Sequence, residues 1–393
     1  MSLSPLQSLL AAALCLLLGA AVNRRVAFLA RYNIPDPITG GLLFAAVASA
    51  ASSAGVTMSL NVAFKSTLLL MFFAGVGMTA DLRLLRQGGK ALLMLLVLLF
   101  PFVIIQNLTG MVVASVLDLH PIFGLVGGSI TLVGGHGTGA AYAERFSEVN
   151  NLQAVMELSM TSATIGLILG GIVAGPVAQF LIKRHGLRST AQDTSAASSD
   201  GSVRTSGLGM VGGLAGILAA VIIGQWLADS LKDLPLMIPS FLWCMITGVV
   251  IRNVAPFARV KIDDQASGLL STICLSLFLV MTMMVLDLID VALSAGPMLL
   301  ILVAQVVVVA AYAAFICFRF MGRDYEAAVT SAAFIGFNMG STATAIANMQ
   351  AITAKYGPAP KSFLIVPLSG AFFVDLMNAV ILTGFLSLRF VGG

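Results

Sequence analysis

Charged side chains are the scarcest feature of this sequence. Its 393 residues include 21 basic and 17 acidic side chains, which together make 10% of the chain. Soluble domains carry about 25% charged residues. So few charges cannot cover a soluble protein of this length without leaving large apolar patches that drive association. The scarcity excludes a soluble enzyme, a nucleic-acid-binding protein and a disordered protein.

Cysteines and catalytic motifs are also in short supply. The four cysteines each lie in an apolar run, without CxxC spacing and without a neighbouring histidine: Cys15, Cys244, Cys274 and Cys317. We interpret them as small packing residues, so no disulfide framework is predicted. The apolar segments contain neither GxSxG nor HExxH, which argues against an enzyme embedded in a membrane.

What the chain does contain is apolar sequence, since the residues AVILMFWYC make 59% of it. A membrane-spanning helix needs about 20 mainly apolar residues. Ten segments of this kind predict an all-α, polytopic membrane protein with ten transmembrane helices. They lie near 3–22, 37–54, 66–80, 91–116, 152–182, 208–228, 236–251, 268–286, 297–318 and 362–388.

The first of these segments has no basic residue before it, whereas Arg24 and Arg25 follow it directly. A cleaved signal peptide has the opposite order of charge, with its basic residues first. We therefore expect an anchored first helix whose N-terminus lies outside the cell.

Two further apolar stretches, 121–143 and 327–349, are poor candidates for spanning helices. The first contains seven glycines in 23 residues, and each glycine inside a helix costs about 1 kcal/mol relative to alanine. Two legs of about ten residues would each rise about 15 Å, half the thickness of the bilayer core. Each stretch is predicted to be a re-entrant hairpin with its tip near the membrane midplane.

The distribution of basic residues tests this topology, because cytoplasmic loops are enriched in Lys and Arg. With ten spans, two hairpins that do not cross and an external N-terminus, 17 of the 21 basic residues fall on the cytoplasmic side. Only Lys65, Arg145, Lys232 and Arg389 remain outside. A spanning first hairpin would carry two basic loops across the membrane and destroy this asymmetry. The C-terminus is accordingly expected outside as well.

One polar stretch divides the chain. Residues 183–206 are rich in Ser, Thr and Ala and lack apolar periodicity, so they are predicted to form a flexible cytoplasmic linker. The stretch separates 1–182 from 207–393, and each half has five spans and one hairpin before its last span. Because five is odd, the two halves have opposite orientations in the membrane.

Three short sequence echoes support a repeat because their offsets are nearly constant. They are Ser66-Thr67 with Ser271-Thr272 at 205 residues, Asp81-Leu82 with Asp287-Leu288 at 206, and Gly137-Thr138 with Gly340-Ser341 at 203. Inverted repeats with broken helices are typical of secondary transporters, whose binding site lies at the midplane where the repeats meet.

The two hairpin tips carry the chemistry that the sequence offers. Glycine allows a ligand to approach the backbone, and a helix that starts at a tip points its positive end at a carboxylate. Close packing through small residues is the alternative interpretation, and His136 could equally serve in packing or capping. The substrate candidates at the tips are Gly135, His136, Gly137, Thr138, Asn338, Gly340, Ser341 and Thr342, and the Na⁺ candidates are Gly134, Ser341 and Thr344.

Ionisable residues inside spans are functional by default, because their burial in lipid is costly. Asp375 lies well inside the last span, with Asn378 one helical turn further on, and its carboxylate could hold Na⁺ or the amino group of an amino acid. A structural hydrogen bond to a hairpin is the alternative for Asp375. Glu157, near the outer end of the fifth span or at the interface, precedes Thr161 and Ser162, and these three complete the Na⁺ candidates.

Several segments resemble the bacterial sodium/glutamate symporters: NIPDPITGGLL, LLLMFFAGVGMTADL, GGHGTGAA, ATIGLILGGIVAGPVA, FNMGSTATAIANM and PLSGAFFVDLMNA. The resemblance covers nearly the whole chain outside the linker. It implies Na⁺-coupled uptake of L-glutamate across a bacterial inner membrane by a homodimer. It also implies an elevator-type mechanism, in which a transport domain moves against a scaffold, with hairpin tips at Gly134–Gly139 and Asn338–Thr342 and a functional Asp at Asp375.

Other interpretations remain open. A carrier of another dicarboxylate, such as a 2-hydroxycarboxylate, with Na⁺ or H⁺ coupling would share this fold, although it would benefit from an intramembrane arginine that is not evident here. A channel would need a continuous polar path, and water channels with two hairpins repeat three spans rather than five. The predicted partners are L-glutamate, Na⁺, the lipid bilayer and a second copy of the chain, with no nucleic acid and no enzymatic activity.

Overall fold

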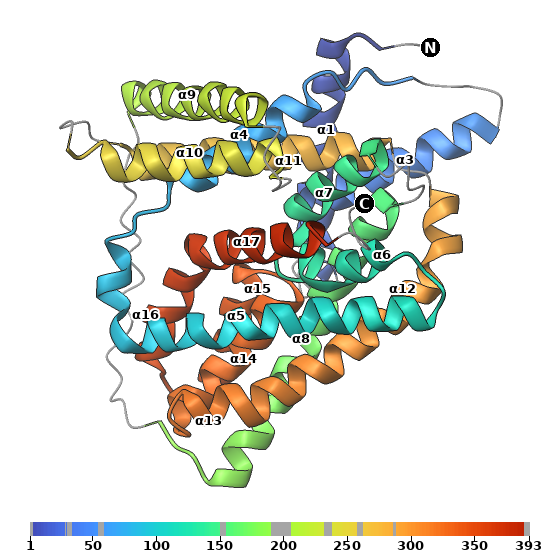
Figure 1. Cartoon of the computed structure of the whole chain (residues 1–393). Coiled ribbons are helices and arrows are strands. Elements are labelled where there is room, and N and C mark those ends of the chain that lie inside the picture. The colour runs from blue at the N-terminus through green and yellow to red at the C-terminus, as the bar shows by residue number, and fades with distance from the viewer. Residues whose placement is uncertain are drawn as a thin grey trace. The chain divides into compact units, whose positions relative to one another are not determined.

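The structure is a computed structural model that describes residues 3–27, 29, 34–53, 59–149, 155–189, 206–231, 238–257, 262–285 and 288–388. Helices dominate this part of the chain (Figure 1). Most of the predicted linker, 190–205, lies outside the described residues. The chain divides into two compact units, of which the first comprises 1–81, 140–157 and 203–294 and the second 82–139, 158–202 and 295–393.

Six of the described helices are long and apolar enough to cross a membrane, as expected of a polytopic membrane protein. They are Pro5–Arg25, Gly88–Val116, Val155–His185, Gly207–Ser230, Asp264–Met284 and Gly296–Phe320. The other four predicted spans coincide with helices that are shorter or richer in Gly, Ala and Ser. These are α3 (Asp36–Ser53), α4 (Lys65–Met78), α10 (Ser240–Val254) and the succession α16 (Pro360–Leu368), η3 (Ser369–Phe373) and α17 (Val374–Leu386). The total of ten spans stays a prediction.

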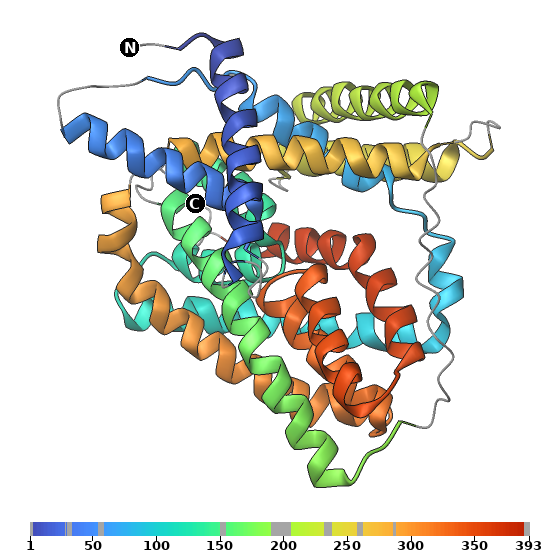
Figure 2. The same ribbon diagram turned by 180° about the vertical axis from the view of Figure 1, so that it is seen from behind.

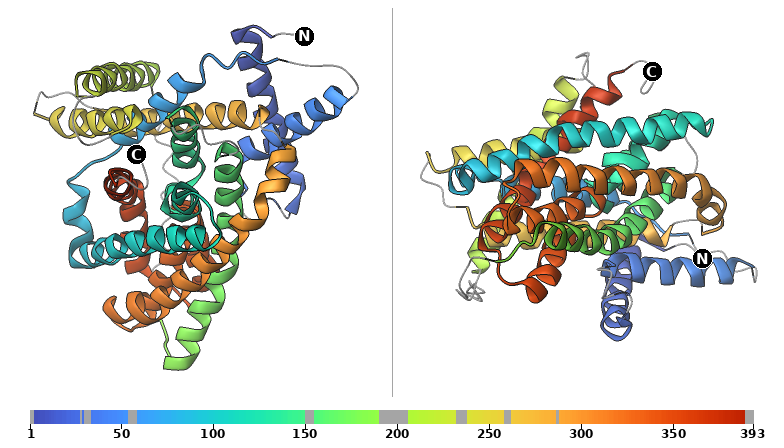
Figure 3. Two further views of the ribbon diagram at one scale, coloured as in Figure 1. Left: turned by 45° about the vertical axis from the view of Figure 1, so that its right-hand side comes forward. Right: turned by 90° about the horizontal axis from the view of Figure 1, so that it is seen from below.

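Helices from the two halves of the sequence pack in matching pairs within the first unit. α1 (Pro5–Arg25) packs against α3 and α11 (Asp264–Met284), and α9 (Gly207–Ser230) packs against α10 and α4. α3 contacts α11, α10 contacts α4, and α4 contacts α11. Exchanging α1, α3 and α4 for α9, α10 and α11 reproduces each of these contacts, although α9 also contacts α11. The pair α9 and α10 is visible side by side in Figures 1 and 3.

Small residues let α4 and α10 approach closely. A Cβ atom at Gly248 would lie 2.5 Å from the carbonyl oxygen of Ala74, and one at Gly77 would collide with the carbonyl oxygen of Met245. Packing through small residues is the usual way in which membrane helices associate, because lipid supplies no hydrophobic driving force between them.

An ion-pair network lies where α4 and α10 end and α11 begins. Arg252, in the last turn of α10, donates to Asp81 at 3.2 Å and to Asp264 at 2.8 Å. The Arg252 side chain is only 9% exposed. Beside it, Asn253 Nδ2 donates to the carbonyl oxygen of Ala80 at 2.8 Å. Two carboxylates thus compensate the desolvation of one buried guanidinium.

Both predicted hairpin stretches form two helices joined by a turn, and the two orange helices of the second stretch lie side by side in Figure 2. Both tips lie in the second unit. α6 (Pro121–Leu125) and the π-helical η1 (Val126–Ile130) lead to a turn at Val133 and Gly134, after which α7 (Gly135–Val149) begins. Gly340 and Ser341 connect α14 (Tyr325–Met339) to α15 (Thr342–Tyr356). Their re-entry into a membrane stays a prediction.

The second hairpin is longer than its apolar stretch, because α14 and α15 have 15 residues each. Each helix is therefore about 22 Å long. Asp324 caps α14 by accepting a hydrogen bond from the Ala327 N–H at 2.7 Å, and Gly357, with φ of 103°, ends α15. Polar residues such as Gln350 and Lys355 continue α15 beyond the point where hydropathy falls.

An aromatic core joins three helices of the second unit. They are α5 (Leu84–Val116), α14, and α12 (Leu288–Tyr312), which continues into the π-helical η2 (Ala313–Cys317) and α13 (Phe318–Phe320). Tyr312 stacks on Phe334 with ring centroids 5.4 Å apart, Phe102 lies 4.9 Å from Tyr312, and the Tyr312 hydroxyl donates to the carbonyl of Leu98 at 2.9 Å. This core fixes α14, and hence one hairpin tip, relative to α5.

Candidate functional site

The two hairpin tips face each other within the second unit. Gly135 begins α7 with φ of 65°, a left-handed conformation that favours glycine. A Cβ atom at Gly135 would lie 3.6 Å from the carbonyl oxygen of Gly340 in the other tip. On α8 (Val155–His185), a Cβ atom at Gly166 would lie 2.8 Å from the carbonyl oxygen of Met339. Glycines thus let three backbone segments meet where the sequence placed the tips.

Two consecutive amide side chains of α5 connect the hairpins. Gln106 Nε2 donates to the carbonyl oxygen of Asn338 at 2.7 Å, and Asn107 Oδ1 accepts from the Ser129 N–H at 2.9 Å. Asn338 belongs to α14 and Ser129 to η1, so one turn of α5 holds both hairpins. α12 supports this turn, because Gln305 Nε2 donates to the carbonyl oxygen of Gln106 at 2.8 Å.

α17 binds the same residue of the first hairpin through its other backbone group. Asn378 Nδ2 donates to the carbonyl oxygen of Ser129 at 3.0 Å. The Ser129 backbone is available for these bonds because Gly128, with φ of −103° and ψ of −136°, interrupts the helical geometry of η1. A Cβ atom at Gly128 would lie 2.8 Å from Asn107 Oδ1, so a larger residue would crowd this contact.

Several buried polar atoms around this network have no hydrogen-bond partner among the described residues. They are Gln106 Oε1, Asn107 Nδ2, Ser129 Oγ, Gln305 Oε1, Asn338 Oδ1 and Asn378 Oδ1. An unpaired buried polar group costs about 1–3 kcal/mol, so this concentration calls for a physical reason. Five of these six atoms are oxygens. Secondary transporters coordinate Na⁺ through oxygen atoms of unwound helix segments.

Asp375 lies in the first turn of α17, directly after the π-helical η3. Within the part of the chain that the structure describes, its carboxylate forms neither a hydrogen bond nor an ion pair, so the alternative of a structural bond to a hairpin is not seen there. The second tip does contact η3, because Thr342 Oγ1 donates to the carbonyl oxygen of Gly370 at 3.2 Å. The tip and the segment leading to Asp375 are therefore adjacent.

His136, the ionisable candidate of the first tip, is 7% exposed and lies 3.0 Å from Thr164 Oγ1 through its Nε2 atom. The Thr164 hydroxyl donates to the carbonyl oxygen of Met160 at 2.9 Å, which makes His136 Nε2 the donor in the first bond. The imidazole is thus held against α8. Whether it also contacts substrate stays a prediction.

The hydroxyl candidates are held in local bonds. Ser162 Oγ lies 2.7 Å from Thr131 Oγ1 in the first hairpin, and both side chains are buried. Ser341 caps α15 by accepting from the Thr344 N–H at 3.3 Å. Thr138 packs on Gly134, where a Cβ atom would lie 2.5 Å from the Thr138 Cβ atom.

Comparison with known proteins identifies the family of this chain. The profile of the family described as sodium/glutamate symporter matches residues 1–358. A sodium/glutamate symporter of Haemophilus influenzae is 38% identical over 388 residues, which cover 96% of each chain. One of Escherichia coli K12 is 38% identical over 398 residues, which cover 100% of this chain and 99% of the relative. The chain belongs to the sodium/glutamate symporter family. This confirms the resemblance found in the sequence motifs.

The similarity to the Escherichia coli symporter includes the end of the chain, beyond residue 358 where the family profile stops. Asp375 and Asn378 therefore lie in the part that the two symporter sequences share.

Four residues of the network in this symporter-family chain were not predicted from the sequence: Gln106, Asn107, Ser129 and Gln305. The sequence candidates came from ionisable side chains in spans and from the glycine-rich tips. Uncharged amides in an apolar helix carry a similar signal, because their polar groups also need partners in the membrane. Gln106, Asn107 and Gln305 are polar interruptions of the predicted spans 91–116 and 297–318.

Glu157 falls in the first unit, unlike the tip residues. There it lines a cavity of about 270 Å³ together with Lys65, Glu144 and Thr282. Lys65 Nζ lies 3.5 Å from a Glu144 carboxylate oxygen. Glu157 thus lines the same cavity as the Lys65–Glu144 pair, and its role as a Na⁺ ligand stays a prediction.

Proposed function

We propose that this protein carries L-glutamate into the cell together with Na⁺ by alternating access. The observation that carries the proposal is the bridge from Gln106 and Asn107 to both hairpin tips, surrounded by unpaired buried oxygens. Membership in the sodium/glutamate symporter family supports the choice of cargo, since both relatives bear that name.

Na⁺ is proposed to bind among oxygens of the tips and of α17. The unpaired atoms Ser129 Oγ, Asn338 Oδ1 and Asn378 Oδ1 are neutral oxygen ligands, and Asp375 supplies a negative charge on the same helix as Asn378. Hard cations favour such oxygen donors over nitrogen or sulfur. A bound cation would satisfy several orphaned atoms at once, which gives the arrangement its energetic rationale.

Glutamate is proposed to bind at the starts of α7 and α15. Each of these helices begins at a tip, at Gly135 and Thr342, so its free N–H groups and positive dipole end are available to a carboxylate. We see no arginine or lysine among the tip residues, so backbone and hydroxyl donors carry anion recognition in this proposal. The amino group of the substrate is assigned to Asp375, alone or in exchange with Na⁺.

The second unit is proposed to be the moving transport domain, because it contains both tips, and the first unit the scaffold. Each unit draws on both halves of the sequence, and the matched contacts of α1, α3 and α4 with α9, α10 and α11 support two inverted five-helix repeats. The repeats are 1–182 and 207–393, with the linker 183–206 between them. An elevator-type motion and a homodimer complete this proposal.

The protein is proposed to reside in a bacterial inner membrane with both termini in the periplasm and the linker in the cytoplasm. The placement of 17 of 21 basic residues on one side supports this orientation. Inward movement of Na⁺ releases about 2.3 kcal/mol per charge per 100 mV, in addition to the concentration term. Two or more Na⁺ per substrate would also offset the net negative charge of glutamate.

Binding of radiolabelled L-glutamate to the purified protein tests the proposal. We expect binding to require Na⁺ and to be displaced by unlabelled L-glutamate but not by malate. The alternative cargo, another dicarboxylate such as a 2-hydroxycarboxylate, predicts equal displacement by malate. Binding that is unchanged when Na⁺ is replaced by K⁺ would contradict the coupling.

A further inference from the structure

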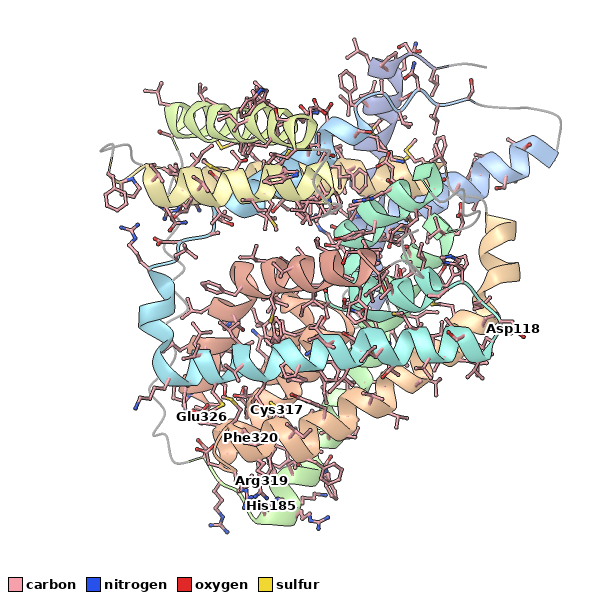
Figure 4. The ribbon with its side chains drawn as sticks, in the orientation of Figure 1. Asp118, His185, Cys317, Arg319, Phe320 and Glu326 are labelled. Atoms are coloured by element: carbon pink, nitrogen blue, oxygen red, sulfur yellow. The ribbon has the colours of Figure 1, made fainter. Side chains whose placement is uncertain are left out.

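A basic pocket of about 270 Å³ lies in the second unit, where α8 ends and α12 passes through η2 into α13. No residue of the hairpin tips lines it. Figure 4 shows His185 and Arg319 together at this end of the unit. Its lining includes four basic groups and three phenylalanines, of which Phe318 is buried and the other two are exposed: Arg184, His185, Arg319, Arg323, Phe180, Phe315 and Phe318.

The local backbone directs these side chains to one place. The π-helical η2 inserts an extra residue into α12, which rotates every following residue by about 100° around the helix axis. Arg323 then adopts φ of 56°, uncommon for a residue with a Cβ atom, and its N–H donates to the carbonyl oxygen of Phe318 at 3.1 Å. His185 packs on Phe318 with ring centroids 5.0 Å apart.

Two carboxylates that follow Arg323 in the sequence bind backbone N–H groups and do not line the pocket. Asp324 accepts from the Ala327 N–H at 2.7 Å, and Glu326 accepts from the backbone N–H groups of Lys361 and Ser362 at 3.1 and 2.8 Å. Among the described residues that line the pocket, Asp and Glu are absent. Among the described lining residues, three guanidinium groups and an imidazole thus come together without a carboxylate.

Apolar surface adjoins this charge. Phe315 is 67% exposed and Phe180 47% exposed, and both lie near the end of a helix that is long and apolar enough to cross a membrane. The Arg184 guanidinium carbon lies 5.5 Å above the centre of the Phe180 ring. Adjacent arginine and phenylalanine side chains suit the membrane interface, where the acyl chains of lipids meet the headgroups.

We propose that this pocket binds the phosphate headgroup of an anionic phospholipid, whose acyl chains lie along Phe180 and Phe315. The basic side chains match a phosphodiester, which accepts the forked hydrogen bonds of arginine. Basic pockets between helices at the cytoplasmic end of membrane proteins bind anionic headgroups in this way. In the orientation proposed above, this end of α8 and α13 faces the cytoplasmic leaflet.

The phenylalanines distinguish a lipid from a free anion. Inorganic phosphate would gain from the basic groups alone and would leave both rings in contact with water. A phospholipid covers the rings with its chains, so its binding buries apolar area in addition to charge.

A fluorescent reporter in the pocket tests the proposal. Phe315→Trp is introduced after replacement of the two native tryptophans, Trp226→Phe and Trp243→Phe, and the protein is reconstituted in phosphatidylcholine vesicles. Brominated phosphatidylglycerol and brominated phosphatidylcholine are then compared as quenchers at equal content. We expect phosphatidylglycerol to occupy the site about fivefold more strongly, as one favourable charged contact at a membrane surface provides. Equal quenching by the two lipids would overturn the proposal.

Charge-neutralised variants distinguish lipid binding in the pocket from attraction to basic residues elsewhere on the surface. Arg319→Gln with Arg323→Gln should reduce the lipid preference to about one, whereas Arg24→Gln with Arg25→Gln, at the exposed end of α1, should preserve it. Each variant is first shown to retain Na⁺-dependent glutamate uptake, which verifies folding. An unchanged preference after neutralisation at 319 and 323 would contradict the assignment.

Inorganic phosphate tests the competing ligand. If it abolishes the quenching preference while sodium chloride at the same ionic strength does not, the pocket is a free-anion site and the lipid proposal is wrong. Retention of the preference in phosphate supports the lipid.

Discussion

Gln106 and Asn338 are 232 positions apart in the sequence, yet the Gln106 amide donates to the Asn338 carbonyl at 2.7 Å. The neighbouring Asn107 holds the Ser129 N–H of the other hairpin at 2.9 Å. A displacement of either hairpin therefore acts on the same turn of α5. In the proposed mechanism, this shared anchor is the physical route by which Na⁺ at one tip organises the carboxylate site at the other.

Removal of the Gln106 amide should weaken cargo binding without unfolding the protein. In Gln106→Ala the buried Asn338 carbonyl loses its donor, which costs about 1–3 kcal/mol. We expect the Na⁺ concentration required for half-maximal glutamate binding to rise about tenfold, since each 1.4 kcal/mol is a factor of ten. Asn253→Ala, which removes a comparable amide–carbonyl bond to Ala80 in the first unit, is the control. An equal effect of both variants would contradict a specific role for Gln106.

Asp375→Asn should abolish coupled uptake. The amide retains an oxygen atom but removes the negative charge to which we assign Na⁺ or the substrate amino group. We expect uptake to fall by about 100-fold or more, which corresponds to about 2.8 kcal/mol. Asp118→Asn is the control, because Asp118 lies at the far end of α5 (Figure 4) with φ of 55°, a conformation that asparagine tolerates. Residual uptake of Asp375→Asn above one tenth of wild type would exclude an essential charge.

A pair of glycine variants tests the geometry of the tips. Gly135→Ala forces a left-handed residue to carry a Cβ atom, which costs roughly 1–2 kcal/mol, and that atom points toward the Gly340 carbonyl. Glutamate uptake should fall. A Cβ atom at Gly171, in α8, would meet nothing within 4 Å, so Gly171→Ala should raise helix stability by up to about 1 kcal/mol with uptake retained. Normal uptake by Gly135→Ala would remove the tip from the mechanism.

The positions of the two tips follow from sequence, because each hairpin stretch concentrates glycine at one place instead of spacing it along a helix face. The turns at Gly134 and at Gly340 lie where the composition of the two stretches predicted them. The anchoring amides Gln106 and Asn107 were not predicted, because the mean hydropathy of their helix stays strongly apolar in spite of these two polar residues. Long-range pairing is also invisible to periodicity: nothing local in α5 indicates that Gln106 meets α14.

Helix lengths were harder to predict than helix positions. The apolar stretch 327–349 understates the second hairpin, because its ends are set by the Asp324 cap and by Gly357 rather than by hydropathy. The predicted span 236–251 ends just before Arg252, yet this residue occupies the last turn of α10, where Asp81 and Asp264 offset the cost of its burial. Tertiary contacts of this kind, which hydropathy does not reveal, set where such a helix ends.

Arg252 should be structural rather than functional. Arg252→Ala removes the cation that Asp81 and Asp264 share. The pair with Asp264 contributes little because that carboxylate is 56% exposed, whereas the side chains of the Arg252–Asp81 pair are only 9% and 14% exposed. Loss of the more buried pair should cost about 1–3 kcal/mol. We expect the thermal unfolding midpoint to fall clearly in detergent. Arg25→Ala, at the exposed end of α1, should leave the midpoint unchanged. Equal midpoints for the two variants would show that the network contributes nothing to the free energy of unfolding.

Uptake of L-glutamate into proteoliposomes with imposed ion gradients tests the central claim that Na⁺ assembles the tips into a glutamate site. Vesicles with an inward Na⁺ gradient should accumulate glutamate above its external concentration, and Asp375→Asn should fail to do so. Vesicles with a proton gradient alone, in the absence of Na⁺, should not accumulate it. Equal accumulation under the two gradients would contradict the claim.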